Sequence, residues 1–247
     1  MFSTAPGHHP PSAPPLLPGL LTVIIPAFNE RPTLLEALDE VRAVPVHKEI
    51  VIIDDASTDG TRELLRTCVE GRYPEVTVLY LPRNSGKGMA IRAALLHVRG
   101  EYVIIQDADL ECVPQEYPAL LRPLVEEGAT VVYGSRFLRE RPRIPLPNLL
   151  INWLLARMVR HLYGFPLSDE ATAYKLFRTQ VLRSVPLTCQ RFEFCPEVTA
   201  KLLRRGHRIV EVPISYRPRT KSQGKKVRAW AGVVAVWTLL KFRLWRG

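Results

Sequence analysis

Residues 20–60 read LLTVIIPAFNERPTLLEALDEVRAVPVHKEIVIIDDASTDG. An apolar run at residues 20–25 precedes a helix-like segment near residues 31–42, and a second apolar run at residues 49–53 precedes another from residue 58 to about 69. Short β-rich runs that alternate with helical segments predict a β-α-β unit with parallel strands. This stretch therefore indicates the α/β fold class.

The same alternation continues along the chain. Further strands are expected at residues 76–81, 101–106 and 130–135, with helices at residues 87–98 and 115–127. The series predicts a mostly parallel central sheet with helices on both faces. In open sheets of this kind the ligand crevice lies at the carboxyl ends of the strands. The residues that follow each predicted strand are therefore candidates for a functional site.

Those residues are unusually polar. They read PAFNE at 26–30, DDASTDG at 54–60, NSGKG at 84–88, DAD at 107–109 and GSR at 134–136.

Asp107 and Asp109 leave a strand two residues apart, so their carboxylates point to the same side. Carboxylate oxygens suit a hard divalent cation such as Mg²⁺ or Mn²⁺, and Glu111 is spaced to complete the set. A metal held in this way keeps sites open for the phosphate oxygens of a substrate. The alternative reading is a surface turn in which the aspartates cap a helix.

The second acidic cluster has two parts. Ser57, Thr58 and Asp59 are typical of a helix N-terminus. Asp54 and Asp55 close an apolar run, so at least one of them must face the crevice. We expect Asp54 or Asp55 to bind a ribose or a base.

The glycines beside Lys87 permit close backbone approach to a ligand, although a plain turn fits as well. The spacings GxxxxGK[ST] and GxGxxG are absent, which argues against a P-loop ATPase and a Rossmann dinucleotide site. Lys87 is therefore a candidate for contact with a ligand.

Charge is concentrated at the end of the chain. The net charge is +10, yet residues 201–247 hold 13 Lys and Arg against one acid, while residues 1–200 sum to −2. Trp230, Trp237 and Trp245 lie within the basic tail, as is typical of membrane interfaces. A solvated basic face is the alternative. Because the excess is local and no recognition motif is present, no nucleic-acid partner is expected.

The four cysteines show neither a CxxC pair nor a metal-ligand spacing, which favours a reducing cytoplasm. Residues 1–19 are rich in proline and predict a disordered lead rather than a signal peptide. The apolar stretch at residues 231–240 is shorter than the roughly 20 residues that cross a bilayer. Any membrane contact is therefore expected to be peripheral, on the cytoplasmic face. We expect Trp153 to pack against the protein.

Taken together, these residues resemble the family 2 glycosyltransferases of GT-A fold, in the dolichol-phosphate mannosyltransferase-like or polyprenyl-phosphate glycosyltransferase branch. The resemblance covers residues 21–226. The segments that carry it are PAFNE, DDASTDGT, RNSGKGMAI, QDADLE, GSRF, DEATAYKLF, FEFCPE and VPISYRPRTKSQGKK.

The resemblance implies roles for individual residues. Asp107 and Asp109 match the metal-binding DxD, with Glu111 in a position where relatives have Gln or Glu. Arg136 matches a basic residue that faces the acceptor phosphate, and Asp169 matches a loop acid. The residues implied in donor binding are Pro26, Phe28, Glu30 and Asp54 for the base and ribose, Arg219 and Lys225 for the diphosphate, and also Lys87.

A lipid phosphate is already ionised at pH 7, so it can attack the anomeric carbon without a strong base, and a single displacement inverts the configuration. Asp169 is the candidate base if the acceptor is a hydroxyl, and otherwise an N-cap or an arginine partner. The resemblance favours GDP-mannose and leaves UDP-glucose and UDP-GlcNAc open. A catalytically silent sugar-nucleotide binding module is the alternative of another class.

The expected organisation is a Pro-rich lead at residues 1–19, a GT-A glycosyltransferase domain at residues 20–228 and a basic amphipathic helix at residues 229–247. The implied partners are a nucleotide-sugar donor, a polyprenyl phosphate acceptor and a membrane surface, with a membrane-anchored partner protein as a further possibility.

Overall fold

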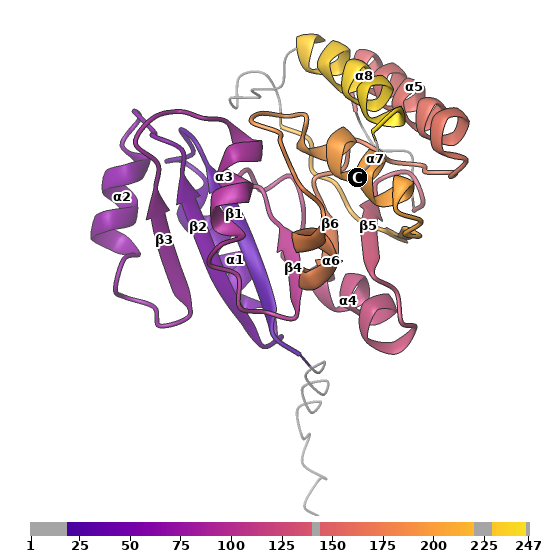
Figure 1. Cartoon of the computed structure of the whole chain (residues 1–247). Helices are drawn as coiled ribbons and strands as arrows, with labels where there is room; N and C mark the ends of the chain where they lie inside the picture. Colours follow the sequence, from indigo (N-terminus) through magenta and orange to yellow (C-terminus); the bar gives the residue numbers. More distant parts are fainter. Residues whose placement is uncertain (1–18, 140–143, 220–228, 246–247) are drawn as a thin grey trace, which may run out of the picture.

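The computed structural model describes residues 19–139, 144–219 and 229–245 (Figure 1). Residues 1–18 of the predicted Pro-rich lead (residues 1–19), Lys225 and the domain boundary at residue 228 lie outside these ranges.

A seven-stranded sheet forms the centre of the molecule, in the order β3-β2-β1-β4-β6-β5-β7. Strands β1 to β4 are parallel to one another, β5 is parallel to β7, and β6 runs antiparallel to both of its neighbours. The strands are β1 (Leu21–Ala27), β2 (Lys48–Asp54), β3 (Val76–Tyr80), β4 (Tyr102–Ile105), β5 (Val131–Ser135), β6 (Lys175–Arg178) and β7 (Val210–Pro213). The mostly parallel sheet is as predicted, whereas β6 and β7 were not foreseen.

Helices cover both faces of the sheet, as predicted. Helices α1, α2 and α4 pack on one face, and α3, α5, α6, α7 and α8 pack on the other. The helices are α1 (Leu34–Ala43), α2 (Thr61–Cys68), α3 (Lys87–Ala94), α4 (Tyr117–Glu126), α5 (Leu146–Tyr163), α6 (Thr179–Ser184), α7 (Phe194–Arg204) and α8 (Ala229–Arg243), with a 3-10 turn η1 (Pro114–Glu116).

A hydrophobic core lies on each face of the sheet. Each buried strand contributes side chains to both cores, because successive side chains point to opposite faces. In β1, Ile24 belongs to the core cluster that includes residues of α3 and α7, whereas Val23 and Ile25 belong to the cluster that includes residues of α1 and α4. All three are fully buried. The apolar run of the sequence is thus a strand covered on both sides.

Helix α2 begins three residues later than predicted. Asp59 accepts hydrogen bonds from the Thr61 backbone amide (3.0 Å) and the Thr61 hydroxyl (2.5 Å), and Gly60 has a left-handed φ of 92°. Asp59 therefore caps the helix. The Ser57 hydroxyl instead accepts the Asn29 amide (2.9 Å) and ties β1 to β2.

Helix α8 lies beside α5 and packs on α7 (Figure 1). Leu239 and Phe242 are buried in the core, while Val233, Trp237 and Leu240 are exposed. Apolar side chains therefore occupy both sides of α8, which differs from the polar face expected of a basic amphipathic helix. No helix within the described ranges has the length and apolar character needed to cross a bilayer.

Candidate active site

A cavity of about 1200 Å³ opens at the carboxyl ends of β1, β2 and β4 and extends between α5 and α8. Pockets for one small molecule are typically about 300–1,000 Å³, so this cavity lies above the upper end of that range. Its location matches the crevice expected from the strand order. The predicted site residues that line it are Pro26, Phe28, Glu30, Lys87, Asp107, Asp109, Glu111, Arg136 and Arg219.

The two adjacent acids at the end of β2 have different roles. Asp54 is fully buried away from the cavity, where it accepts bonds from Arg62 Nε (2.6 Å) and the Ser57 amide (3.2 Å). Asp55 lines the cavity. The expectation that one of the two acids faces the crevice is met by Asp55, and the assignment of donor binding to Asp54 needs correction. Consecutive strand residues point to opposite sides, so only one could face the cavity.

Asp55 also holds the NSGKG turn. Its carboxylate accepts hydrogen bonds from the backbone amides of Ser85 and Gly86, both at 2.7 Å, and from Asn84 Nδ2 at 3.0 Å.

The glycines of this turn approach another segment of the protein. The backbone amides of Gly88 and Met89 donate to the carbonyls of Arg191 (3.0 Å) and Gln190 (2.9 Å). A Cβ on Gly86 would lie 2.6 Å from the Gln190 carbonyl oxygen. The N-terminus of α3 is therefore occupied by the segment before α7, and the glycines permit that contact.

Lys87 reaches from α3 into the cavity and pairs with Asp107, with 2.5 Å between Nζ and Oδ1. Burial disfavours the ammonium charge, but the Asp107 carboxylate outweighs this effect and raises the pKa of Lys87. Lys87 thus remains a cation at the acidic end of the cavity.

At this end of the cavity, the negative charge of Asp109 is disfavoured by its surroundings. Burial, followed by the negative charges of Asp107 and Glu111, raises the pKa of Asp109 to about 7, although Arg219 opposes the shift. Arg219 Nη2 lies 3.1 Å from Asp109 Oδ2, and Nη1 lies 3.1 Å from Glu30 Oε2. The site therefore favours additional positive charge.

Glu111 faces a different neighbour. Its carboxylate accepts the Tyr216 hydroxyl (2.6 Å) and the Arg219 backbone amide (2.8 Å). Within the described part of the chain, no group of three His, Cys, Asp or Glu side chains is arranged as a metal site. The predicted set of three carboxylates is therefore not assembled here, and Asp107 and Asp109 suit a cation that takes its remaining ligands from a diphosphate and water.

Arg136 and Asp169 form a buried pair beside the acidic cluster. Arg136 Nε and Nη2 each lie 2.7 Å from one Asp169 oxygen, and the Arg136 amide donates to the same carboxylate at 3.1 Å. Burial disfavours the guanidinium charge, but Asp169 outweighs it and raises the pKa of Arg136. Asp169 is fully buried and does not line the cavity, so the structure supports its reading as an arginine partner over its reading as a base.

Several lining residues were missed by the sequence analysis. Tyr216 and Arg191 come from segments far from the strand ends, and nothing in their local sequence signals the cavity. Glu170 follows Asp169, is fully buried, and has no hydrogen-bond partner for its carboxylate oxygens among the described residues. Burial raises the pKa of Glu170 against the opposing charge of Lys175.

The other end of the cavity is apolar. Its lining includes Ile151 and Leu155 of α5 and Val234 and Ala235 of α8. A Cβ on Gly232 would lie 2.7 Å from the Ile151 side chain, so the two helices approach closely at this point. The cavity thus joins a charged end to an apolar end.

A family model described as glycosyl transferase family 2 matches residues 22–185. The chain belongs to this family. An undecaprenyl-phosphate mannosyltransferase from Micrococcus luteus is 30% identical over 240 residues, which cover 90% of this chain and 97% of that protein. An undecaprenyl-phosphate 4-deoxy-4-formamido-L-arabinose transferase from Edwardsiella ictaluri is 30% identical over 216 residues, covering 83% of this chain and 62% of that protein. A dolichyl-phosphate beta-glucosyltransferase from Trichomonas vaginalis is 30% identical over 216 residues, covering 79% and 65%. This family 2 chain spans less than two thirds of the length of the last two relatives.

Solved structures show the same fold. Glucosyl-3-phosphoglycerate synthase from Mycobacterium tuberculosis, in complex with Mn²⁺, UDP and phosphoglyceric acid, aligns with a TM-score of 0.70 at 20% identity, covering 93% of this chain and 80% of that one. Mannosyl-3-phosphoglycerate synthase from Rubrobacter xylanophilus aligns with a TM-score of 0.68 at 20% identity, covering 90% and 74%. These alignments confirm the predicted GT-A fold, while the family model and the curated relatives confirm the membership of family 2.

Proposed function

We propose that this chain transfers a sugar from a nucleoside diphosphate donor to a polyprenyl phosphate at the cytoplasmic face of a membrane, with GDP-mannose as the favoured donor. The observation that carries the proposal is the single cavity that joins a carboxylate-rich end to an apolar end between α5 and α8. A charged nucleotide sugar and a lipid phosphate need these two environments side by side.

The donor is assigned to the carboxylate end. Pro26 near the end of β1 and Phe28 just after it line the cavity together with Asp55, and we assign the base and ribose to this part. Lys87 and Arg219 supply positive charge for a diphosphate. Mg²⁺ or Mn²⁺ held by Asp107 and Asp109 would neutralise charge on the departing diphosphate.

The acceptor phosphate is assigned to Arg136. The Asp169 carboxylate fixes the Nε and Nη2 sides of this guanidinium, and Arg136 still lines the cavity. A phosphate oxygen attacks the anomeric carbon, the bond from that carbon to the donor diphosphate breaks, and the nucleoside diphosphate leaves with the electron pair. The configuration inverts, and no proton has to be removed.

Two other glycosyl transfers are alternatives to the proposed reaction: one uses a UDP-sugar donor, and the other uses a hydroxyl acceptor. Relatives are named for mannose, glucose and arabinose derivatives, and the aligned structure from Mycobacterium tuberculosis contains UDP, so UDP-glucose and UDP-GlcNAc remain alternative donors. A hydroxyl acceptor would need a base, and both oxygens of Asp169 are engaged with Arg136.

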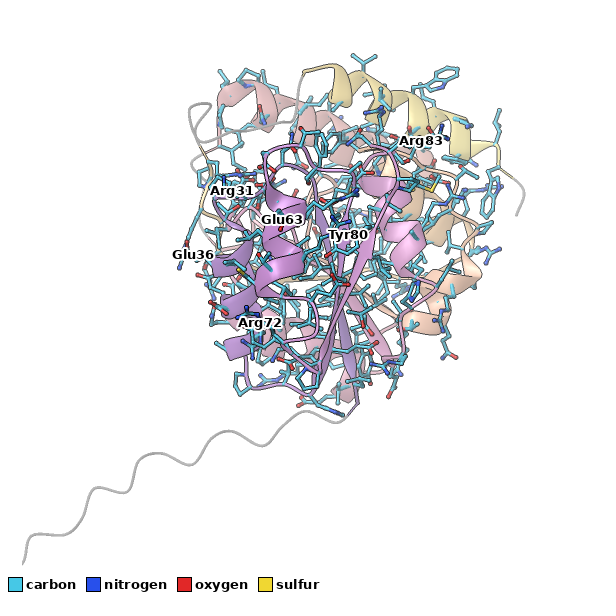
Figure 2. The ribbon with its side chains drawn as sticks, turned by 90° about the vertical axis from the view of Figure 1, so that its left-hand side faces the viewer. Arg31, Glu36, Glu63, Arg72, Tyr80 and Arg83 are labelled. Atoms are coloured by element: carbon cyan, nitrogen blue, oxygen red, sulfur yellow. The ribbon has the colours of Figure 1, made fainter. Side chains whose placement is uncertain are left out.

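The membrane surface is assigned to the outer sides of α5 and α8. Trp153 is 61% exposed, contrary to the expected packing, and Trp237 is 65% exposed. The other exposed apolar side chains of these helices and the turn after them are Leu146, Leu150, Leu154, Val233, Leu240 and Leu244. Contiguous exposed apolar side chains mark interaction surfaces. By contrast, the side of α2 and β3 presents charges of both signs, including Arg31, Glu63 and Arg72 (Figure 2).

The proposal is tested with the purified chain, vesicles that contain undecaprenyl phosphate, Mn²⁺ or Mg²⁺, and labelled GDP-mannose, UDP-glucose or UDP-GlcNAc. Metal-dependent label in the lipid phase from one donor is the expected result and identifies the sugar. Nucleotide binding without transfer from any donor would instead indicate a silent binding module.

A further inference from the structure

The segment Ile214–Arg219 crosses the carboxyl end of β4 after β7 ends. Tyr216 forms an isolated antiparallel bridge with Cys112, and the Arg217 amide donates to the Glu111 carbonyl at 2.8 Å. The Ser215 amide donates to both carboxylate oxygens of Glu116 at 3.0 Å. Backbone and side-chain bonds thus hold this segment against the chain that follows the predicted metal-binding aspartates.

The Glu111 carboxylate is the central contact of this arrangement. One oxygen accepts the Tyr216 hydroxyl and the other accepts the Arg219 amide, at 2.6 Å and 2.8 Å. The first bond holds the Tyr216 side chain, and the second holds the backbone of Arg219 three residues later. Glu111 therefore holds the Arg219 backbone in place, and this sets the point from which the Arg219 side chain extends.

The Arg219 guanidinium lies between two strand ends, bound to Glu30 after β1 and to Asp109 after β4. Its side chain is only 14% exposed. The Asp109 oxygen that accepts this bond is one of the two on which a cation would bind. A divalent ion at that oxygen would also place two like charges close together.

We propose that Glu111 is a positioning residue: through the Arg219 segment it places Arg219 on Asp109 and Glu30 as a built-in counter-cation, which leaves Asp109 when a metal and a nucleoside diphosphate bind. This inference rests on the proposed function. A diphosphate offers Arg219 a bidentate anionic partner in exchange for Asp109. The affinities for metal and nucleoside diphosphate are then coupled, each ligand strengthening the binding of the other.

The test measures Mn²⁺ affinity by electron paramagnetic resonance of free Mn²⁺, with and without GDP or UDP. The wild-type chain is compared with Glu111→Ala, Glu111→Gln, Arg219→Gln and the double variant Glu111→Ala/Arg219→Gln. Arg217→Gln is the matched control, because it lies in the same segment but its 65% exposed side chain faces Glu40. Thermal unfolding verifies that each variant is folded.

The expected readout is the ratio of Mn²⁺ affinities with and without nucleoside diphosphate. Glu111→Ala and Arg219→Gln each reduce this ratio about tenfold, within the range typical of coupled sites, and the double variant reduces it no further. Glu111→Gln retains the ratio, since the amide oxygen still accepts the Arg219 amide and the amide nitrogen reaches Tyr216. Arg219→Gln also binds Mn²⁺ alone more tightly than wild type, because a competing cation is gone.

Three results would overturn the inference. If Glu111→Ala and Glu111→Gln both weaken Mn²⁺ binding at least about tenfold and leave the ratio unchanged, Glu111 is a metal ligand. If Arg219→Gln changes neither value while wild type binds Mn²⁺ with nucleotide, Arg219 is no counter-cation and the proposed function stands. If no form of the chain binds Mn²⁺ with either nucleotide, the inference and the proposed donor site fail together.

Discussion

The two ends of the cavity are held in place by different forces. At the strand end, hydrogen bonds and ion pairs fix each carboxylate: Asp55 binds the turn before α3, and Asp109 binds Arg219. At the helix end, Ile151 and Gly232 meet by close packing of α5 on α8. Removing one partner of a buried charge pair has a large free-energy cost, whereas the contribution of an apolar wall is proportional to the area it buries. Substitutions at the strand end should therefore change the reaction far more than substitutions at the helix end.

Asp109→Asn should have the largest effect. Transfer is expected to fall at least about 1000-fold, because a bound metal contributes several kcal/mol of transition-state stabilisation. Steady-state transfer measures this loss. Asp39→Asn is the control, since Asp39 is 71% exposed on α1 and its distance from Arg42 is 3.7 Å. Activity of Asp109→Asn within about tenfold of wild type would remove Asp109 from the reaction.

The same variant should not lose stability at pH 8. The pKa of Asp109 is raised from 3.8 to about 7, so the folded state keeps a proton that the unfolded state has released. This group therefore lowers the free energy of unfolding as pH rises from about 4 to about 7, and the penalty persists above pH 7. Asparagine removes it. Urea unfolding at pH 5 and pH 8 should show a gain for Asp109→Asn that is greater at pH 8, and a clear loss at pH 8 would contradict this account.

Asp169→Asn should have the next largest effect, on stability as well as transfer. It leaves the buried Arg136 charge uncompensated, and breaking such a pair costs about 3 kcal/mol or more of unfolding free energy. Glu126→Gln is the matched control on α4, where Arg122 and Glu126 are both exposed and 3.7 Å apart, and it should cost about 0.5 kcal/mol or less. Urea unfolding measures both losses. Equal losses in the two variants would mean that the buried Arg136–Asp169 pair contributes no more to stability than an exposed pair.

Gly232→Leu should have a smaller and more selective effect. A Cβ at this position already meets Ile151 at 2.7 Å, and both residues line the cavity, so a leucine side chain occupies space between α5 and α8 and narrows the apolar end. The expected outcome is a rise of about tenfold in KM for the lipid acceptor, with donor KM unchanged. Val233→Leu, at an exposed position of the same helix, is the control. A similar rise in donor KM would show that the two ends of the cavity do not bind donor and acceptor independently.

Trp237→Ser should have the smallest effect. The side chain is 65% exposed on α8, and losing its contact with lipid is expected to reduce partition onto anionic vesicles by about threefold to tenfold. Leu96→Ser is the control, because Leu96 is 83% exposed but lies after α3. Vesicle flotation of the purified chain measures this. Equal losses for both variants would exclude the α5–α8 surface as the specific membrane contact.

The sequence predicts the charged end of the cavity better than the apolar end. Alternating β and α segments locate the strand ends, and Asp107, Asp109 and Lys87 follow directly from that position. Local spacing cannot reveal that Glu111 contacts Tyr216 and Arg219, because these partners are more than a hundred positions apart. Likewise, β6 has only four residues, too few for a pattern that predicts its antiparallel direction.

The adjacent acids at the end of β2 show a second limit of prediction from sequence. The sequence requires that Asp54 or Asp55 face the crevice, but it does not specify which, because the choice depends on which face of β2 Arg62 of α2 covers. Helix α8 shows a third. Its tail position and charge suggested a separate surface helix, whereas burial of Leu239 and Phe242 makes it part of the main core.

The central claim is that the acceptor is a phosphate that enters from the apolar end. The most direct measurement compares undecaprenyl phosphate with undecaprenol of the same chain length as acceptors, using the active donor and analysing the product anomer by NMR. We expect transfer to the phosphate, inversion at the anomeric carbon, and no detectable transfer to the alcohol. Equal transfer to the alcohol, or a product of retained configuration, would contradict it.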